Sequence, residues 1–156
     1  KIIMTKLLTL AATLLFATTA LAQNNNNAYK LRTTVENVYG VQEIENGNYT
    51  DGIRKLNAQL ARTTVMTKQA PLHTNLCVAH IATGNLEAAQ THCAKAVDQS
   101  GNKSIALNNL AVLNCLENKA TLCVENFERS VAANKLNRFS SNNLTLANTR
   151  LQISKN

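Results

Sequence analysis

Four cysteines are the residues of this chain most able to do chemistry, and their spacing limits what that chemistry can be. They are Cys77, Cys93, Cys115 and Cys123. None of them lies in a CxxC pair, which would give a thiol-disulfide oxidoreductase its reactive thiolate, or in a CxxCH haem-attachment sequence. The four thiols are therefore expected either to pair with one another or to bind a metal.

Three histidines make the metal alternative concrete. His73, Cys77 and His80 recur at i, i+4 and i+7, which puts them on one face of a helix, and His92 and Cys93 follow on the next helix. Imidazole and thiolate together can bind zinc or copper. Such a site needs reduced cysteines, whereas buried histidines beside a disulfide need no metal. The sequence favours the second arrangement, with no cofactor, and leaves a Cys/His metal-binding module as an alternative.

The rest of the chain offers little to an enzyme or a nucleic-acid-binding protein. It has no GxSxG, no Gly-rich phosphate loop and no HExxH, and its carboxylates are scattered singly. The net charge is +7, but the basic residues are dispersed and only six residues are aromatic. We therefore expect neither catalysis nor a nucleic-acid partner.

The first 22 residues have the pattern of a bacterial export signal. Lys1 and Lys6 supply positive charge, an apolar run follows, and Ala20-Leu21-Ala22 is typical of a cleavage site. We predict cleavage before Gln23, no stable membrane insertion afterwards, and a periplasmic or secreted location where cysteines pair. The polar tract after the signal predicts a flexible leader over residues 23–32.

From Thr33 onward, apolar and small residues recur at helical spacing, and no segment alternates as a strand does. A helix-turn-helix pattern repeats about every 34 residues. Its turns are Gly47-Asn48-Tyr49, Gly84-Asn85-Leu86 and Asn118-Lys119-Ala120. A period of this length predicts an all-α stack of hairpins, because each unit buries its apolar face only against its neighbours.

These units resemble the tetratricopeptide repeat, in which small and large residues hold fixed places in 34 residues. Units that begin at Thr33, Ala70 and Ser104 match it at positions 7, 8, 15, 17, 20 and 24. The matching residues are Tyr39, Gly40, Gly47, Tyr49, Gly52 and Leu56; Leu76, Cys77, Gly84, Leu86, Ala89 and Cys93; and Leu110, Ala111, Asn118, Ala120, Cys123 and Phe127. The aromatic residue of position 4 is absent from all three units.

The resemblance implies a right-handed α-α superhelix, or solenoid. Its three repeats would cover about 33–69, 70–103 and 104–137. Residues 138–156 would form a C-terminal capping helix, with Leu144, Ala147 and Leu151 on the face that covers the last repeat.

Hairpin geometry then selects one of the three possible disulfide connectivities. Residues at equal distances from the turn lie at the same height in an antiparallel hairpin. Cys77 and Cys93 are equidistant from Asn85, and Cys115 and Cys123 are equidistant from Lys119. We predict the pairs Cys77–Cys93 and Cys115–Cys123.

In the resembled family the first helix of each repeat lines a concave groove, which implies a site for a peptide or helix of a partner protein. The residues that would line this partner-binding groove are Asn37, Val41, Ile44, Thr74, Val78, Ile81, Asn108, Val112 and Leu116. Val and Ile would supply shallow pockets, and the Asn side chains can both donate to and accept from an extended backbone.

The expected function is a periplasmic or secreted scaffold for protein-protein interaction. The alternative is a self-associating structural subunit, a homo-oligomer whose short stacks join end to end. A capping helix over the third repeat would block that stacking.

Overall fold

Seven helices make up the protein between residues 28 and 154, the residues that the structure, a computed structural model, describes. They are α1 (Val41–Glu45), α2 (Tyr49–Leu60), α3 (Met66–Ala82), α4 (Leu86–Gln99), α5 (Ser104–Leu116), α6 (Ala120–Ala133) and α7 (Arg138–Ile153). This part of the chain contains no strand. The expectation of an all-helical protein is confirmed.

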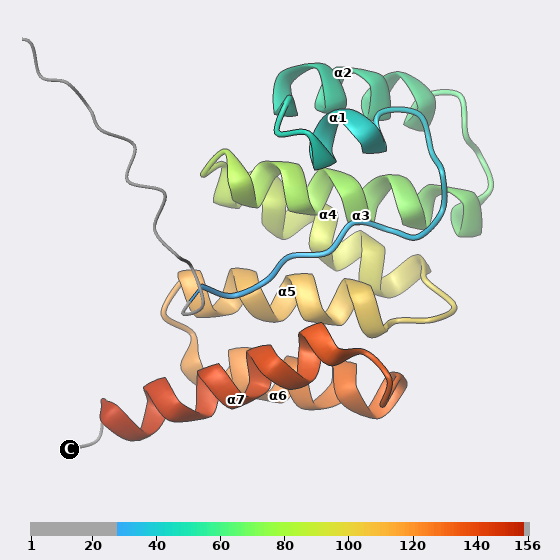
Figure 1. Ribbon diagram of the computed structural model, residues 1–156. Coiled ribbons are helices and arrows are strands. Elements are labelled where there is room, and N and C mark those ends of the chain that lie inside the picture. The colour runs from blue at the N-terminus through green and yellow to red at the C-terminus, as the bar shows by residue number, and fades with distance from the viewer. Residues whose placement is uncertain (1–27, 155–156) are drawn as a thin grey trace, which may run out of the picture.

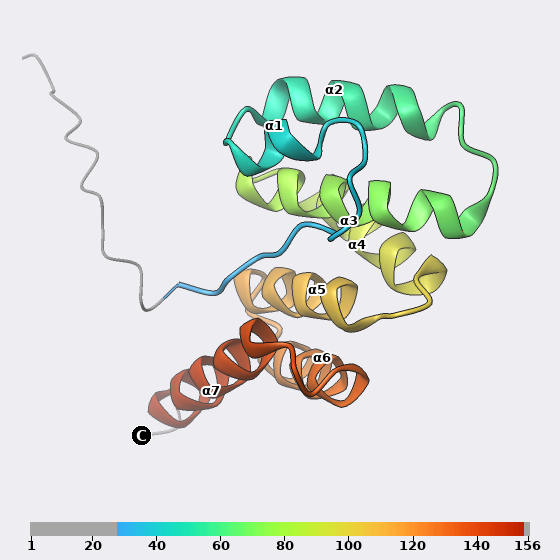
Figure 2. The ribbon, with the colours of Figure 1, turned by 45° about the vertical axis from the view of Figure 1, so that its right-hand side comes forward.

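The helices lie one pair above another along the molecule (Figure 1), and the turned view keeps the same order (Figure 2). Within each pair the turn contains one left-handed residue. These residues are Gly47, Gly84 and Asn118, with φ of 78°, 75° and 60°. They stand at the three turns that the sequence marked, because a helix ends readily where the backbone can become left-handed.

Two of the pairs are also joined covalently. The Cys77–Cys93 disulfide links α3 to α4, and the Cys115–Cys123 disulfide links α5 to α6. The Cα atoms are 4.9 Å and 5.0 Å apart, respectively. These are the two pairs that the hairpin geometry selected, and they leave no free cysteine.

The core is divided into three clusters that follow the stacking of the helices. Leu56, Leu72 and Leu76 fill the first, between α2 and α3. Both sulfurs of the Cys77–Cys93 disulfide belong to the second. Phe127, which is fully buried, is the largest side chain of the third. Each cluster therefore depends on contacts between neighbouring pairs of helices.

The first hairpin differs from the predicted register. A helix was expected from Thr33, but α1 begins only at Val41 and has 5 residues. Gly40 has φ of +100°, and a Cβ there would lie 2.9 Å from the carbonyl oxygen of Gly52. The small residue that permits this close approach also interrupts the helix. The predicted unit 33–69 therefore lacks most of its first helix.

The second boundary also shifts. The unit was expected to begin at Ala70, but α3 begins at Met66 and contains Pro71 inside it. Residues 66–69 extend the helix before its expected start. Because proline has no N–H, Pro71 cannot bond to the carbonyl of Thr67 one turn back, and α3 lacks this one hydrogen bond near its start.

Helix α7 covers the last pair. It packs against α5 and α6, with Ala147 buried beside Phe127 and Leu144 at the edge of the same cluster. This is the contact expected of a capping helix.

Among residues 28–154, no helix is long and apolar enough to cross a membrane. The predicted signal and its cleavage before Gln23 lie outside the described residues.

Candidate functional site

The most informative site is formed where the chain before α1 lies across the first helices of successive pairs. This segment, residues 29–34, belongs to the blue trace that passes α5 and α3 on its way to α1 (Figures 1 and 2). Three asparagines hold it: Asn75 in α3, Asn109 in α5 and Asn143 in α7. They are spaced 34 residues apart, since 109 − 75 = 34 and 143 − 109 = 34.

Each of these amides bonds to the backbone of one residue of the segment. Asn109 accepts the N–H of Arg32 at 3.0 Å and donates its Nδ2 to the carbonyl oxygen of the same residue at 2.7 Å. Asn143 bonds to the N–H and carbonyl of Lys30 in the same way, both at 2.9 Å. This two-point contact reproduces the pairing that a neighbouring β-strand would offer.

We call each contact between one of these amides and the segment a rung, and the third rung has only one of its two hydrogen bonds. Asn75 Oδ1 accepts the N–H of Thr34 at 2.9 Å, while its Nδ2 is buried without a hydrogen-bond partner. Rungs therefore fall on every second residue of the segment, about 7 Å apart along an extended chain. The segment runs from α7 toward α3, opposite to the order of the repeats. We call Asn75, Asn109 and Asn143 the amide ladder.

A buried polar network fixes the ladder. Asn108 donates to the carbonyl of Lys30 at 3.0 Å and accepts from Asn143 Nδ2 at 2.9 Å. Ser140 donates to the same Asn108 oxygen at 3.3 Å and bonds to Ser130 at 2.6 Å. All four helix-borne side chains are buried. Because buried amides are costly when unpaired, these contacts hold the ladder in one orientation.

No family model, curated protein or solved structure matches this chain.

The predicted groove residues do not line an open surface. Val41, Ile44, Thr74, Val78, Ile81, Asn108 and Val112 are all buried. Asn37 is exposed in the loop before α1, and Leu116 is 49% exposed at the end of α5. Of the nine, Asn108 touches the segment through a hydrogen bond, and Ile44 and Val78 border a hollow of about 590 Å³ beside it.

The contacts of residues 29–32 correct the prediction of a flexible leader that reaches residue 32. Sequence reasoning also missed the ladder. Two signals could have found the site. One is the repetition of Asn at the 34-residue period, and the other is the alternation of Tyr29 and Leu31 with basic residues.

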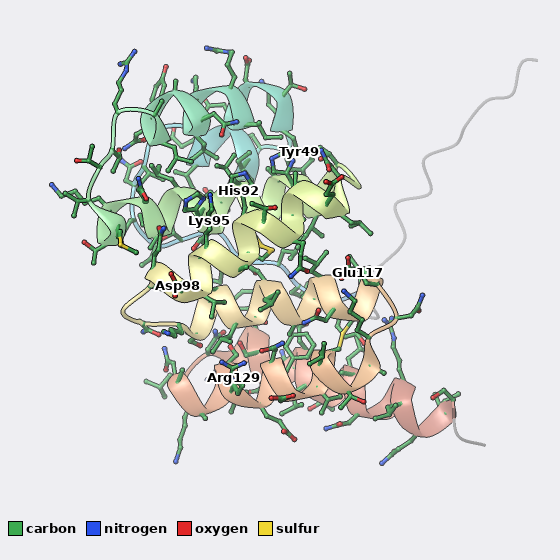
Figure 3. The ribbon with its side chains drawn as sticks, turned by 180° about the vertical axis from the view of Figure 1, so that it is seen from behind. Tyr49, His92, Lys95, Asp98, Glu117 and Arg129 are labelled. Carbon is green, nitrogen blue, oxygen red and sulfur yellow. A yellow bond between two sulfur atoms is a disulfide. The ribbon has the colours of Figure 1, made fainter. Side chains whose placement is uncertain are left out.

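The histidines form a separate group, on the face that Figure 3 shows from behind. His92 and Lys95 lie close together there on α4. The Nδ1 atoms of His73 and His92 face each other at 2.9 Å, and the His80 ring stacks on that of His92. Cys77 and Cys93 are oxidised and offer no thiolate here. No group of three or more potential ligands among the described residues is arranged to hold a metal.

Burial lowers the pKa of His73 to about 4, with a smaller effect from Lys95. Burial also lowers the pKa of His92 to about 4, helped by His73, His80 and Lys95. The unfolded chain therefore binds protons near pH 6.5 that the folded chain takes up only near pH 4. The contribution of these two histidines to the free energy of unfolding is fully present above pH 6.5. It falls as the pH drops toward 4, by at most about 1.4 kcal/mol per pH unit for each histidine.

We expect the wild-type chain to lose more stability between pH 7 and pH 4.5 than a His73→Asn/His92→Asn variant, whose amides do not titrate. Urea unfolding at several pH values measures the two slopes. Hydrogen bonds from Lys55 and Arg54 lower the pKa values of Glu43 and Asp51, respectively. Both chains contain these carboxyls, so their contribution to the pH dependence cancels in the comparison. Parallel profiles would show that the histidines do not carry the acid sensitivity.

Proposed function

We propose that this protein is an exported interaction scaffold with a tetratricopeptide-like superhelix. It binds an extended segment of a partner protein along the first helices of its repeats. The observation that carries the proposal is the amide ladder, whose rungs Asn75, Asn109 and Asn143 repeat with the 34-residue unit and bond to an extended backbone.

Recognition through backbone N–H and carbonyl groups suits a protein-binding role. Every residue type except proline offers both groups, so a ladder of amides accepts many sequences as long as the segment is extended. The binding free energy of this mode of recognition becomes more favourable as the number of rungs increases. It needs no catalytic residue and no cofactor.

The two disulfides support a location in an oxidising compartment, in agreement with the predicted export signal. The left-handed residues at Gly47, Gly84 and Asn118, at the turns of successive pairs, support the superhelical arrangement. The contacts of α7 with α5 and α6 support its role as a cap, which disfavours end-to-end stacking.

A peptide added in trans tests the proposal. The host is the full chain with Tyr29→Ser and Leu31→Ser, which removes the two large apolar contacts of its own segment and leaves the ladder intact; we call it the opened chain. The probe is a fluorescent peptide AYKLRTTVE, the sequence of residues 28–36. We expect it to bind, and we expect Asn109→Ala in the opened chain to weaken binding about tenfold or more.

Backbone methylation separates ladder binding from nonspecific adhesion. Methylating the peptide nitrogen that matches Arg32 removes a rung and should weaken binding about tenfold. Methylating the nitrogen that matches Thr33, which donates no hydrogen bond within the described chain, is the matched control. Equal affinities of the two methylated peptides, or no binding by the parent peptide, would refute the proposed function.

A further inference from the structure

Residues 29–34 also show which side chains the groove accepts between its rungs. Tyr29 and Leu31, the two large apolar residues, alternate with the rung residues Lys30 and Arg32. In an extended chain, alternate side chains point to opposite sides. The groove therefore contacts the side chains of Tyr29 and Leu31, while the ladder bonds to the backbone of Lys30 and Arg32.

The place of Tyr29 is built for an aromatic ring. Its ring centroid lies 5.7 Å from that of the buried Phe127, and the Arg150 guanidinium lies over it at 4.6 Å. Tyr29 borders a hollow of about 290 Å³ that is also lined by the Cys115–Cys123 disulfide and by Ala147. A ring that lies between an aromatic side chain and a cation gains from both contacts, which a small or aliphatic side chain does not.

The place of Leu31 is the junction of the whole core. Leu31 packs against all three clusters, whose buried members include Leu76, Leu113 and Ala111, respectively. A branched aliphatic side chain fits this position because apolar side chains meet it from all three clusters. By contrast, the Arg32 guanidinium lies over the partly exposed ring of Phe139. This residue is held by its backbone more than by a pocket.

We infer that the partner segment carries an aromatic residue followed two positions later by leucine, and that it enters with its N-terminal end at α7 and runs toward α3. Residues 29–34 are the tethered stand-in for that segment. The inference rests on the proposed function, since it specifies the ligand of the same ladder.

The chain that connects the stand-in to α1 is largely exposed, so few buried contacts there oppose its release. Val35, which follows the last rung, is 77% exposed, and Glu36 and Asn37 are exposed as well. A tether of this kind keeps the segment at an effective concentration in the millimolar range. A free partner segment must compete with it, so the intact chain should bind such a segment more weakly than the opened chain.

The experiment measures the affinities of four fluorescent peptides for the opened chain and the wild-type chain. They are AYKLRTTVE, its Tyr→Ser and Leu→Ser variants, and a matched control with serine in place of the exposed valine. We expect the control to bind like the parent and the other two to bind at least tenfold more weakly. We also expect the wild-type chain to bind the parent at least tenfold more weakly than the opened chain.

A second host guards against a folding defect in the opened chain. A site for a specific protease is inserted between Glu36 and Asn37 of the otherwise wild-type chain, and cleavage leaves the segment held by noncovalent contacts alone. Circular dichroism checks the helices of both hosts. The labelled parent peptide should exchange into the cleaved chain and not into the uncleaved one.

The outcomes separate the two claims. If all four peptides bind equally and still respond to methylation at the arginine nitrogen, the scaffold function stands and the aromatic-x-leucine preference is refuted. If no peptide binds either host, both are refuted. A wild-type dimer that the free peptide converts to monomers would overturn the tethered stand-in in favour of segment exchange between two copies of this chain.

Discussion

Replacing Asn109 with aspartate is expected to lower the free energy of unfolding by about 3 kcal/mol at pH 7 and to release residues 29–34 from the helices. The change keeps the size of the side chain. It removes the Nδ2 donor that bonds to the Arg32 carbonyl at 2.7 Å and puts a carboxylate oxygen against that carbonyl. Because Asn109 is fully buried, solvent cannot compensate for the lost bond.

The pH dependence makes this prediction specific. Burial raises the pKa of the introduced carboxyl, and its protonated form can again donate to the Arg32 carbonyl. An acid whose folded-state pKa is raised loses stability as the pH rises, so the deficit relative to wild type should shrink as the pH falls toward 5. Urea unfolding measures the deficit, and amide hydrogen exchange of Arg32 reports release of the segment.

Asn142→Asp is the matched control, since Asn142 is exposed on α7 beside a ladder residue. It should change the free energy of unfolding by less than about 0.5 kcal/mol. Retained protection of Arg32 in the Asn109→Asp chain, or a deficit that does not depend on pH, would show that the amide does not hold the segment.

The parts of the fold that the sequence predicts are those fixed by local rules that repeat. The turns at Gly84 and Asn118 follow from the need for a left-handed residue, and the two disulfides follow from the heights of Cys77 and Cys93, and of Cys115 and Cys123, around those turns. Periodicity and hairpin geometry act within one unit and its neighbour. They can therefore be evaluated without knowing how distant segments pack.

The ladder could not be predicted in this way because it joins segments far apart in the sequence. The bond from Asn143 to Lys30 spans 113 residues. Residues 29–34 have no periodic partner of their own, and their polar flank at 23–27 favours disorder when considered alone. What orders them is the set of buried amides on α3, α5 and α7. A buried Asn repeated at the period of a helical repeat is thus a sequence signal for a site that binds extended chain.

Replacing both Cys77 and Cys93 with alanine is expected to lower the free energy of unfolding by about 3 kcal/mol. The two cysteines are 16 residues apart, and loop closure of that length accounts for most of the effect. Both side chains are buried in the second cluster beside Leu113, so the lost sulfur contacts add to it. Urea unfolding of chains purified without reductant measures the difference.

The second disulfide provides the internal comparison. Cys115 and Cys123 are 8 residues apart, so the corresponding double alanine variant should lose about 2.5 kcal/mol, and Cys115 is only partly buried. If a reductant lowers the stability of wild type by more than either variant loses alone, both bonds exist in the folded protein and act separately. A Cys77→Ala/Cys93→Ala chain as stable as wild type would mean that α3 and α4 are held together by packing alone. The support from this bond for an oxidising compartment would then be lost.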